Sequence, residues 1–168
     1  MPLERFSAAW REQYVSSTGA TTSNASSGEC VFCALALAPV SASSGVLWSN
    51  ETTYVALNAF PYGSGHLLIL PRRHVADLGE LTETEYEDFF LAIRRVVVAL
   101  ERAYEPDGMN VGMNLGKAAG AGIPSHLHGH ALPRWNGDTN FMTAIGETRV
   151  LPESLASTWE KVHAQLGA

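Results

Sequence analysis

Three of the six histidines of this chain occupy alternate positions in residues 126–130, which read HLHGH. In a β-strand, alternate side chains point to the same face and repeat about every 7 Å, whereas residues two apart in a helix point in different directions. The spacing therefore predicts a strand over residues 126–132 that presents His126, His128 and His130 on one surface. A histidine-rich metal-binding tract is the alternative interpretation.

The rest of the chain indicates several short strands and one long helix. Thr82 and Glu85 have the spacing of a capping box, and apolar residues follow at three- and four-residue steps as far as about Tyr104. A shorter helix is expected over residues 152–166. Strands are expected over residues 52–57, 66–70 and 109–114. We expect an α+β domain built on an antiparallel sheet, with one long helix and a shorter C-terminal helix.

The length of 168 residues suits a single domain. Residues 3–15 carry aromatic side chains at helical spacing, and residues 16–28 are almost entirely small or polar, which is typical of a flexible linker. We therefore divide the chain into an N-terminal segment, residues 1–28, and a folded domain, residues 29–168.

The composition argues against several functional classes. Lys and Arg number 11 and Asp and Glu number 17, for a net charge of −6, which disfavours binding to a nucleic-acid duplex. No apolar run approaches the ~20 residues of a membrane-spanning helix, and the first residues lack the pattern of a secretory signal. We expect a cytoplasmic protein without membrane contact.

The histidine segment follows a glycine-rich loop, and this combination suggests chemistry on phosphate. Backbone N–H groups around Gly120 and Gly122 could hold phosphate oxygens, and Lys117 in the same loop could reach a polyphosphate. A neutral histidine could then attack phosphorus while neighbouring imidazolium groups stabilise the developing charge. An ordinary connecting loop is the other interpretation of the glycines.

The chain has two cysteines, Cys30 and Cys33, whose two-residue gap lets both thiolates bind one tetrahedral Zn²⁺. A redox pair is the alternative, but it would need a βαβ setting that the sequence does not indicate. Because a second cysteine pair is missing, histidines would have to complete a zinc site. His74 and His126 are the candidates.

Residues 126–132 resemble the His-φ-His-φ-His-φ-φ signature of the histidine triad (HIT) family, in which φ is apolar. Residues 57–58 with 65–71, and residues 110–116, resemble two further blocks of that family. The resemblance covers roughly residues 30–140. The segments WREQYV, LPRW and GDTNFM are similar to the diadenosine tetraphosphate phosphorylase-like branch of the family.

The resemblance implies a role for each matching residue. It makes His128 the nucleophile on the α-phosphorus of a nucleotide. His130 would contact the phosphate and assist the leaving group, and His66 would support the site from a neighbouring strand. Asn58 stands where the family binds the ribose, and Asn114 matches an Asn that contacts the phosphate region.

The activity implied by the resemblance is that of a nucleotidyl transferase or hydrolase acting at the α-phosphate of an adenine nucleotide or dinucleoside polyphosphate. Phosphorolysis of diadenosine tetraphosphate is the leading expectation. Hydrolysis of a nucleoside phosphoramidate or a dinucleoside polyphosphate is the alternative, and a non-catalytic nucleotide-binding module is the alternative of another class. The resemblance also implies a homodimer and a structural zinc held by Cys30, Cys33, His74 and His126.

Three positions depart from the family pattern. Gly129 replaces an apolar side chain inside the triad, where a strand glycine often marks a close approach of neighbouring atoms. Ile123 stands where the hydrolase branches carry Ser or Thr, and Ser125 stands where the phosphorylase-like branch is often acidic. These departures concern which leaving group the site assists and which acceptor it prefers.

Overall fold

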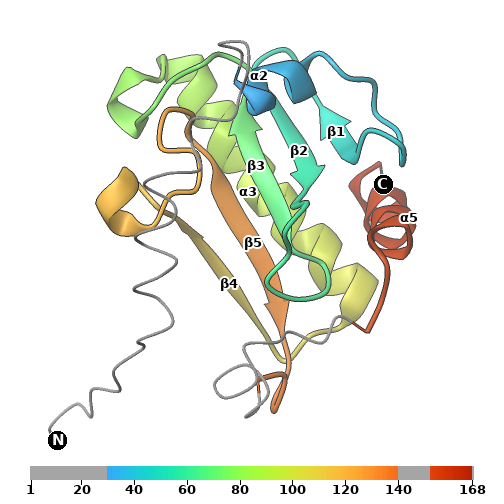
Figure 1. Cartoon of the computed structure of the whole chain (residues 1–168). Helices are drawn as coiled ribbons and strands as arrows, with labels where there is room; N and C mark the ends of the chain where they lie inside the picture. Colours follow the sequence, from blue (N-terminus) through green and yellow to red (C-terminus); the bar gives the residue numbers. More distant parts are fainter. Residues whose placement is uncertain (1–29, 140–151, 168) are drawn as a thin grey trace, which may run out of the picture.

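The computed structural model of the chain describes residues 30–139 and 152–167, so the expected N-terminal helix and linker lie outside the described residues. Five strands form one antiparallel sheet in the order β1-β2-β3-β5-β4 (Figure 1). The expected α+β class is thus confirmed. The strands are β1 Val46–Ser49, β2 Thr53–Leu57, β3 Leu67–Pro71, β4 Gly108–Met113 and β5 Gly129–Arg134.

The described residues also form the helices α2 Val31–Ala36, α3 Glu83–Tyr104 and α5 Leu155–Leu166, and the short 3-10 helices η2 Leu78–Glu80 and η3 Lys117–Ala119. The predicted capping box of α3 is confirmed. The Glu85 N–H donates to the Thr82 hydroxyl at 3.3 Å, and the Thr82 N–H donates to the Glu85 carboxylate at 2.8 Å. None of the described helices combines the length and apolar character needed to cross a membrane.

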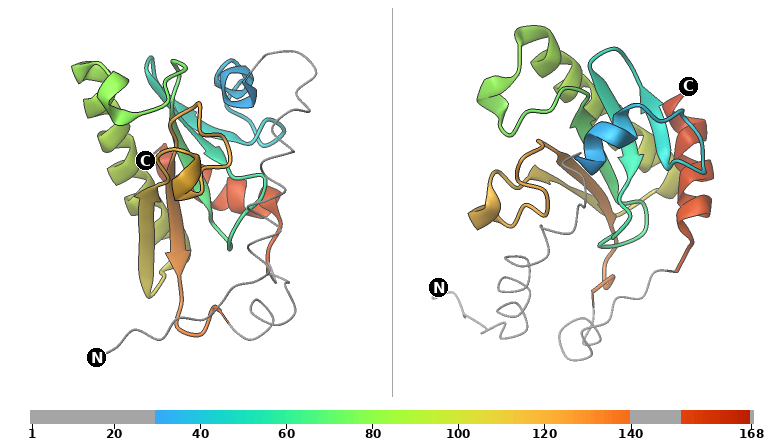
Figure 2. Two further views of the ribbon diagram at one scale, coloured as in Figure 1. Left: turned by 60° about the vertical axis from the view of Figure 1, so that its left-hand side comes forward. Right: turned by 45° about the horizontal axis from the view of Figure 1, so that its top comes forward.

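Side chains of the central strands alternate between two cores, one on each face of the sheet. Val55 of β2 packs in the core that contains Phe89 of α3, whereas its neighbour Tyr54 packs in the core that contains Phe32 of α2. Figure 2 shows α3 on one side of the sheet and α2 on the other. Because strand side chains alternate, the position of a residue in β5 decides which face it joins.

Gly129 lies on the α3 face of β5, and the structure explains why it is a glycine. A Cβ atom at this position would lie 3.3 Å from Cζ of Phe89, so a side chain here would require the Phe89 ring to move. His130 is the next residue and pairs with Leu68, a member of the core on the α2 face. The glycine therefore lets α3 pack closely on β5 while the adjacent imidazole projects to the opposite face.

The predicted start of the histidine strand is wrong. Strand β5 begins only at Gly129. The Leu127 N–H donates to the Val75 carbonyl at 2.6 Å instead of to a neighbouring strand, so residues 126–128 lie outside the sheet. His126 and His128 therefore precede the strand, and His126 turns toward the two cysteines. The sequence analysis also missed strand β1, while the strands over 52–57, 66–70 and 109–114 are confirmed within one residue at each end.

The two edges of the sheet differ. At β1, Nε1 of Trp159 donates to the Val46 carbonyl at 2.9 Å, and Nδ1 of His163 lies 2.8 Å from the Leu47 carbonyl oxygen. Both side chains come from α5, which lies beside β1 (Figure 1). At the other edge, β4 pairs only with β5 among the described strands. Val111 in this edge strand is 47% exposed.

Candidate active site and metal cluster

His66 and His130 meet where β3 and β5 run side by side. His66 immediately precedes β3, and His130 is the second residue of β5. Nε2 of His66 lies 3.0 Å from Nδ1 of His130, and the backbone N–H of Tyr62 donates to Nδ1 of His66 at 3.0 Å. The Tyr62 ring packs against both imidazoles, with centroids 4.6 and 6.0 Å away. The two rings are therefore held by hydrogen bonds as well as by packing.

The direction of these hydrogen bonds fixes the tautomer of each neutral ring. A backbone N–H can only donate, so Nδ1 of His66 accepts from Tyr62 and Nε2 of His66 carries the proton. That Nε2–H donates to Nδ1 of His130, which leaves the proton of His130 on its Nε2. This last atom is buried and has no hydrogen-bond partner among the described residues.

Burial, reinforced by the nearby His128, lowers the pKa of His130 to about 4 from its ordinary value of 6.5. His130 is therefore a neutral imidazole at neutral pH. The sequence analysis expected imidazolium groups beside the nucleophile, and His130 does not fit that expectation. It offers instead an uncharged N–H donor, which is directional and does not need to be protonated first.

His128 is held by the backbone of the triad itself. Its Nδ1 lies 2.7 Å from the His126 carbonyl oxygen, which can only accept, so Nδ1 carries the proton in the neutral ring. Nε2 then has the lone pair. The residue is only 6% exposed, and its ring centroid lies 5.2 Å from that of Phe32 and 5.1 Å from that of His130. The ring that presents this lone pair thus lies next to the ring of His130, edge to face with it.

A cavity of about 740 Å³ opens beside β4 and β5, and its lining includes consecutive residues of the exposed edge strand β4. This volume lies within the range of small-molecule pockets, about 300 to 1,000 Å³. Of the residues singled out from the sequence, His66, His130 and Asn114 line the cavity, and His128 does not. The lining also contains residues that the sequence did not single out, among them Tyr62, Asn110, Gly112, Leu132 and Arg134.

The other expected substrate-binding residues lie outside the lining of this cavity. Oδ1 of Asn58 accepts the Phe60 N–H at 3.0 Å, and Nδ2 of Asn58 lies 3.3 Å from Nδ1 of His66, so this side chain supports the histidine pair. Lys117, Gly120 and Gly122 are exposed in the loop around η3. Gly120 has a φ of 92°, so the turn itself favours a glycine there.

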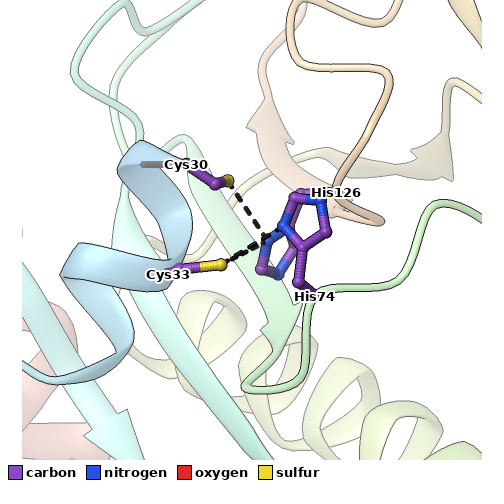
Figure 3. Close-up of side chains that lie close together, drawn as sticks. All are labelled: Cys30, Cys33, His74 and His126. Atoms are coloured by element: carbon purple, nitrogen blue, oxygen red, sulfur yellow. Dashed lines mark hydrogen bonds between the residues drawn. The ribbon is translucent and has the colours of Figure 1, made fainter. Parts of the chain in front are cut away.

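Cys30, Cys33, His74 and His126 form a cluster in which one ligand atom from each lies within 4.8 Å of the others. Sγ of Cys33 lies 3.2 Å from Nδ1 of His74, and Sγ of Cys30 lies 3.4 Å from Nδ1 of His126. Figure 3 shows the thiol of Cys33, on α2, and that of Cys30, just before this helix, both directed toward the imidazoles. Three separate segments of the chain therefore converge on one point.

The chemistry of this cluster fits a zinc ion. Tetrahedral Zn²⁺ with Cys and His ligands places the ligand atoms about 3.3 to 3.8 Å apart, and the distances of 3.2 and 3.4 Å are close to that range. Nε2 of His126 donates to the Pro71 carbonyl at 2.9 Å, which leaves Nδ1 unprotonated and directed at the thiols. Desolvation, reinforced by Cys30, raises the pKa of the Cys33 thiol.

The fold and the site together define an α+β domain with an imidazole-lined ligand cavity and a separate Cys₂His₂ cluster. A protein-family model described as "HIT domain" matches residues 41–137, more than half of the chain. The chain therefore belongs to the HIT family.

Three relatives illustrate the range of the family. An AP-4-A phosphorylase of Mycobacterium tuberculosis is 39% identical over 113 residues, which are 67% of this chain and 58% of that protein. The asymmetrical bis(5'-nucleosyl)-tetraphosphatase of Schizosaccharomyces pombe is 33% identical over 95 residues, 56% of this chain and 52% of that protein. The chain thus spans little more than half the length of these curated relatives.

The third relative is a solved structure, a Zn-bound histidine triad family protein from Mycobacterium smegmatis. It is 28% identical to this chain and superimposes with a TM-score of 0.66 over 83% of this chain and 94% of that one. The similarity therefore extends over most of both molecules.

Proposed function

We propose that the protein transfers a nucleotidyl group through a transient covalent bond to His128. The observation that carries the proposal is the pairing of two neutral tautomers. His128 presents a lone pair at Nε2, and His130 presents a buried N–H that has no partner among the described residues, with the ring centroids 5.1 Å apart. A nucleophile beside a preorganised donor is the arrangement that attack on a phosphoryl group requires.

In the first step, Nε2 of His128 bonds to the α-phosphorus, and the bond from phosphorus to the leaving oxygen breaks with its electron pair on that oxygen. The His128 ring becomes cationic, and the His126 carbonyl that accepts from its Nδ1–H stabilises the charge. The N–H of His130 donates to a phosphoryl oxygen. In the second step an oxygen of the acceptor attacks phosphorus, and the phosphorus–nitrogen bond breaks to restore neutral His128.

The acceptor that we propose is inorganic phosphate, and the substrate is diadenosine tetraphosphate. Transfer of the adenylyl group to phosphate gives ADP, and ATP is the leaving group. The relative named AP-4-A phosphorylase supports this choice, because its identity of 39% exceeds the 33% of the tetraphosphatase. Hydrolysis of a dinucleoside polyphosphate or a nucleoside phosphoramidate, with water as the acceptor, is the alternative.

The test has two parts. Incubation with diadenosine tetraphosphate in the presence and absence of phosphate should give ADP and ATP only when phosphate is present, and a rate indifferent to phosphate would contradict the phosphorylase. Mass spectrometry of quenched protein should detect an adenylyl adduct on the peptide that contains His128. His128→Ala should lose both the adduct and turnover.

A non-catalytic nucleotide-binding module is the second candidate. It is favoured by one observation, the absence of His128 from the described lining of the cavity. This candidate predicts that nucleotides bind without an adduct or turnover, and that His128→Ala binds as the native protein does.

We further propose that the Cys₂His₂ cluster holds a structural zinc. Four protein ligands leave no open coordination position, and a closed site is typical of structural zinc. A bound ion would connect α2 to the segment that precedes β5. Equal activity and stability before and after metal removal would contradict this role.

We also propose a homodimer formed through the edge of β4. This strand, GMNVGM, carries no charge and no proline, the features that usually protect an exposed edge from pairing. The neighbouring helix α3 exposes Tyr86 by 49% and Leu91 by 58%. Light scattering after size exclusion should give twice the chain mass, and Val111→Lys should shift the protein to the monomer.

A further inference from the structure

Strand β4 presents an open position directly beside His130. Gly112 pairs with His130, and Asn110 pairs with Leu132, so both β4 residues share the cavity-facing side with their partners. Asn114 follows at the next alternate position, and all three residues line the cavity. The wall next to His130 therefore consists of two amides with a gap between them.

The backbone does not require glycine at this gap. The φ of Gly112 does not lie in the left-handed region, and a Cβ atom there would meet nothing within 4 Å. Glycine weakens a strand interior relative to other residues, so its presence here destabilises β4 without any benefit to packing. What it provides is free space above the strand beside the N–H donor of His130.

The side chains around the gap suit a chain of phosphates. Oδ1 of Asn110 accepts from Nη1 of Arg134 at 2.7 Å, which leaves the Nδ2 amide as the group that can donate to a ligand. The one carboxylate of the lining, Asp138, is paired with the same guanidinium at 2.5 and 2.7 Å. The side-chain amides of Asn110 and Asn114 are therefore the donors that this wall offers to phosphate oxygens on either side of Gly112.

We propose that the groove over Gly112 binds the polyphosphate of the leaving group, and that the missing side chain at this position sets the length of polyphosphate that the site accepts. The proposal rests on the proposed function, because it takes His130 to contact the phosphate where the leaving group begins. The class of ligand is a nucleoside polyphosphate esterified at its far end. A ligand that ends at the α-phosphate does not enter the groove.

The test compares two ligands in three variants of the full chain. His128→Ala serves as the background, so that neither ligand is consumed, and calorimetry measures the affinities for AMP and diadenosine tetraphosphate. In this background the longer ligand should bind more tightly. Adding Gly112→Val should reduce the ratio of the two affinities by about tenfold or more, because a branched side chain fills the groove.

Gly108→Val is the matched control. Gly108 lies in the same strand and also has nothing within 4 Å of a Cβ atom, but it does not line the cavity. It should leave the affinity ratio unchanged, and neither valine variant should melt below the background, because valine suits a strand better than glycine does. If AMP binds but Gly112→Val leaves the ratio unchanged, the groove proposal is wrong and the proposed function stands. If neither ligand binds, both proposals are overturned.

Discussion

Nε2 of His66 donates to Nδ1 of His130 across 3.0 Å, and this one contact determines which nitrogen of His130 faces the ligand as a donor. The direction of this hydrogen bond is fixed by the backbone N–H of Tyr62. That group can only donate to Nδ1 of His66, so the proton of the neutral His66 ring is on Nε2. The orientation of the site is therefore set by the β2–β3 turn as much as by the triad segment.

Replacing His66 tests this relay. His66→Phe keeps a ring of similar shape but removes the donor to His130, so the N–H of His130 is no longer directed at the phosphate. We expect kcat to fall by about 10²-fold, the effect of losing one preorganised donor, with a smaller change in KM. Tyr62→Phe is the control, because it keeps the backbone N–H. Equal losses in the two variants would contradict the relay, because only His66→Phe removes the donor to His130.

The low pKa of His130 predicts a pH dependence of stability. Burial holds the pKa at about 4 in the folded protein, below the ordinary value of 6.5, so the unfolded chain binds a proton more readily. Stability from the neutral ring is therefore complete above about pH 6.5 and is lost as the pH falls toward 4. The melting temperature should drop across this interval, and His130→Gln should reduce that drop. The same slope in the variant would assign the effect to other groups.

Loss of a zinc ligand should lower metal content and stability together. His74→Ala leaves three ligands, so we expect the zinc content measured by mass spectrometry and the melting temperature both to fall. His74→Cys is the matched variant, because Cys₃His is also a structural zinc set. It should retain the metal. A melting temperature that stays constant while zinc is lost would contradict a stabilising role for the metal.

The contact between Gly129 and Phe89 predicts a specific packing cost. Gly129→Val forces a side chain against the Phe89 ring, and overpacking of this kind typically costs about 1–3 kcal/mol of unfolding free energy. Urea denaturation measures it. Adding Phe89→Leu should make the pair less destabilising than the sum of the single changes. Strict additivity would mean that Phe89 does not cause the restriction.

The long helix and the buried strands were predicted correctly, because the local sequence signals for them coincide with the tertiary structure. Thr82 and Glu85 form the capping box, and the buried strands carry β-branched and large apolar residues. Strand β1 was missed because a serine-rich stretch precedes it and the strand is only four residues long, with an irregularity between Val46 and Trp48. The two-residue period of the histidines correctly placed His130 on a strand. The hydrogen bond from Leu127 to Val75 and the contact of His126 with the cysteine thiols are tertiary interactions, which no local pattern predicts.

The site was predicted in part for the same reason. The Cys₂His₂ set could be proposed from spacing and family resemblance, and the structure does bring the four residues together. Gly129 departs from the family pattern and could indicate a close approach, but only the structure identifies Phe89 as the neighbour. The alternation of Asn110, Gly112 and Asn114 was readable in the sequence, but its meaning depended on the register that sets Gly112 against His130.

The side chains of Trp159 and His163 have a consequence for assembly. By taking up two carbonyl groups of β1, they leave the described sheet with only one side that can be extended by another chain. If two copies pair through this edge, neither has an open edge left for a third copy. Edge-to-edge pairing would therefore give a dimer and not a fibre. In the proposed dimer, helix α5 would thus keep β1, the edge opposite to the contact, from pairing with a further copy.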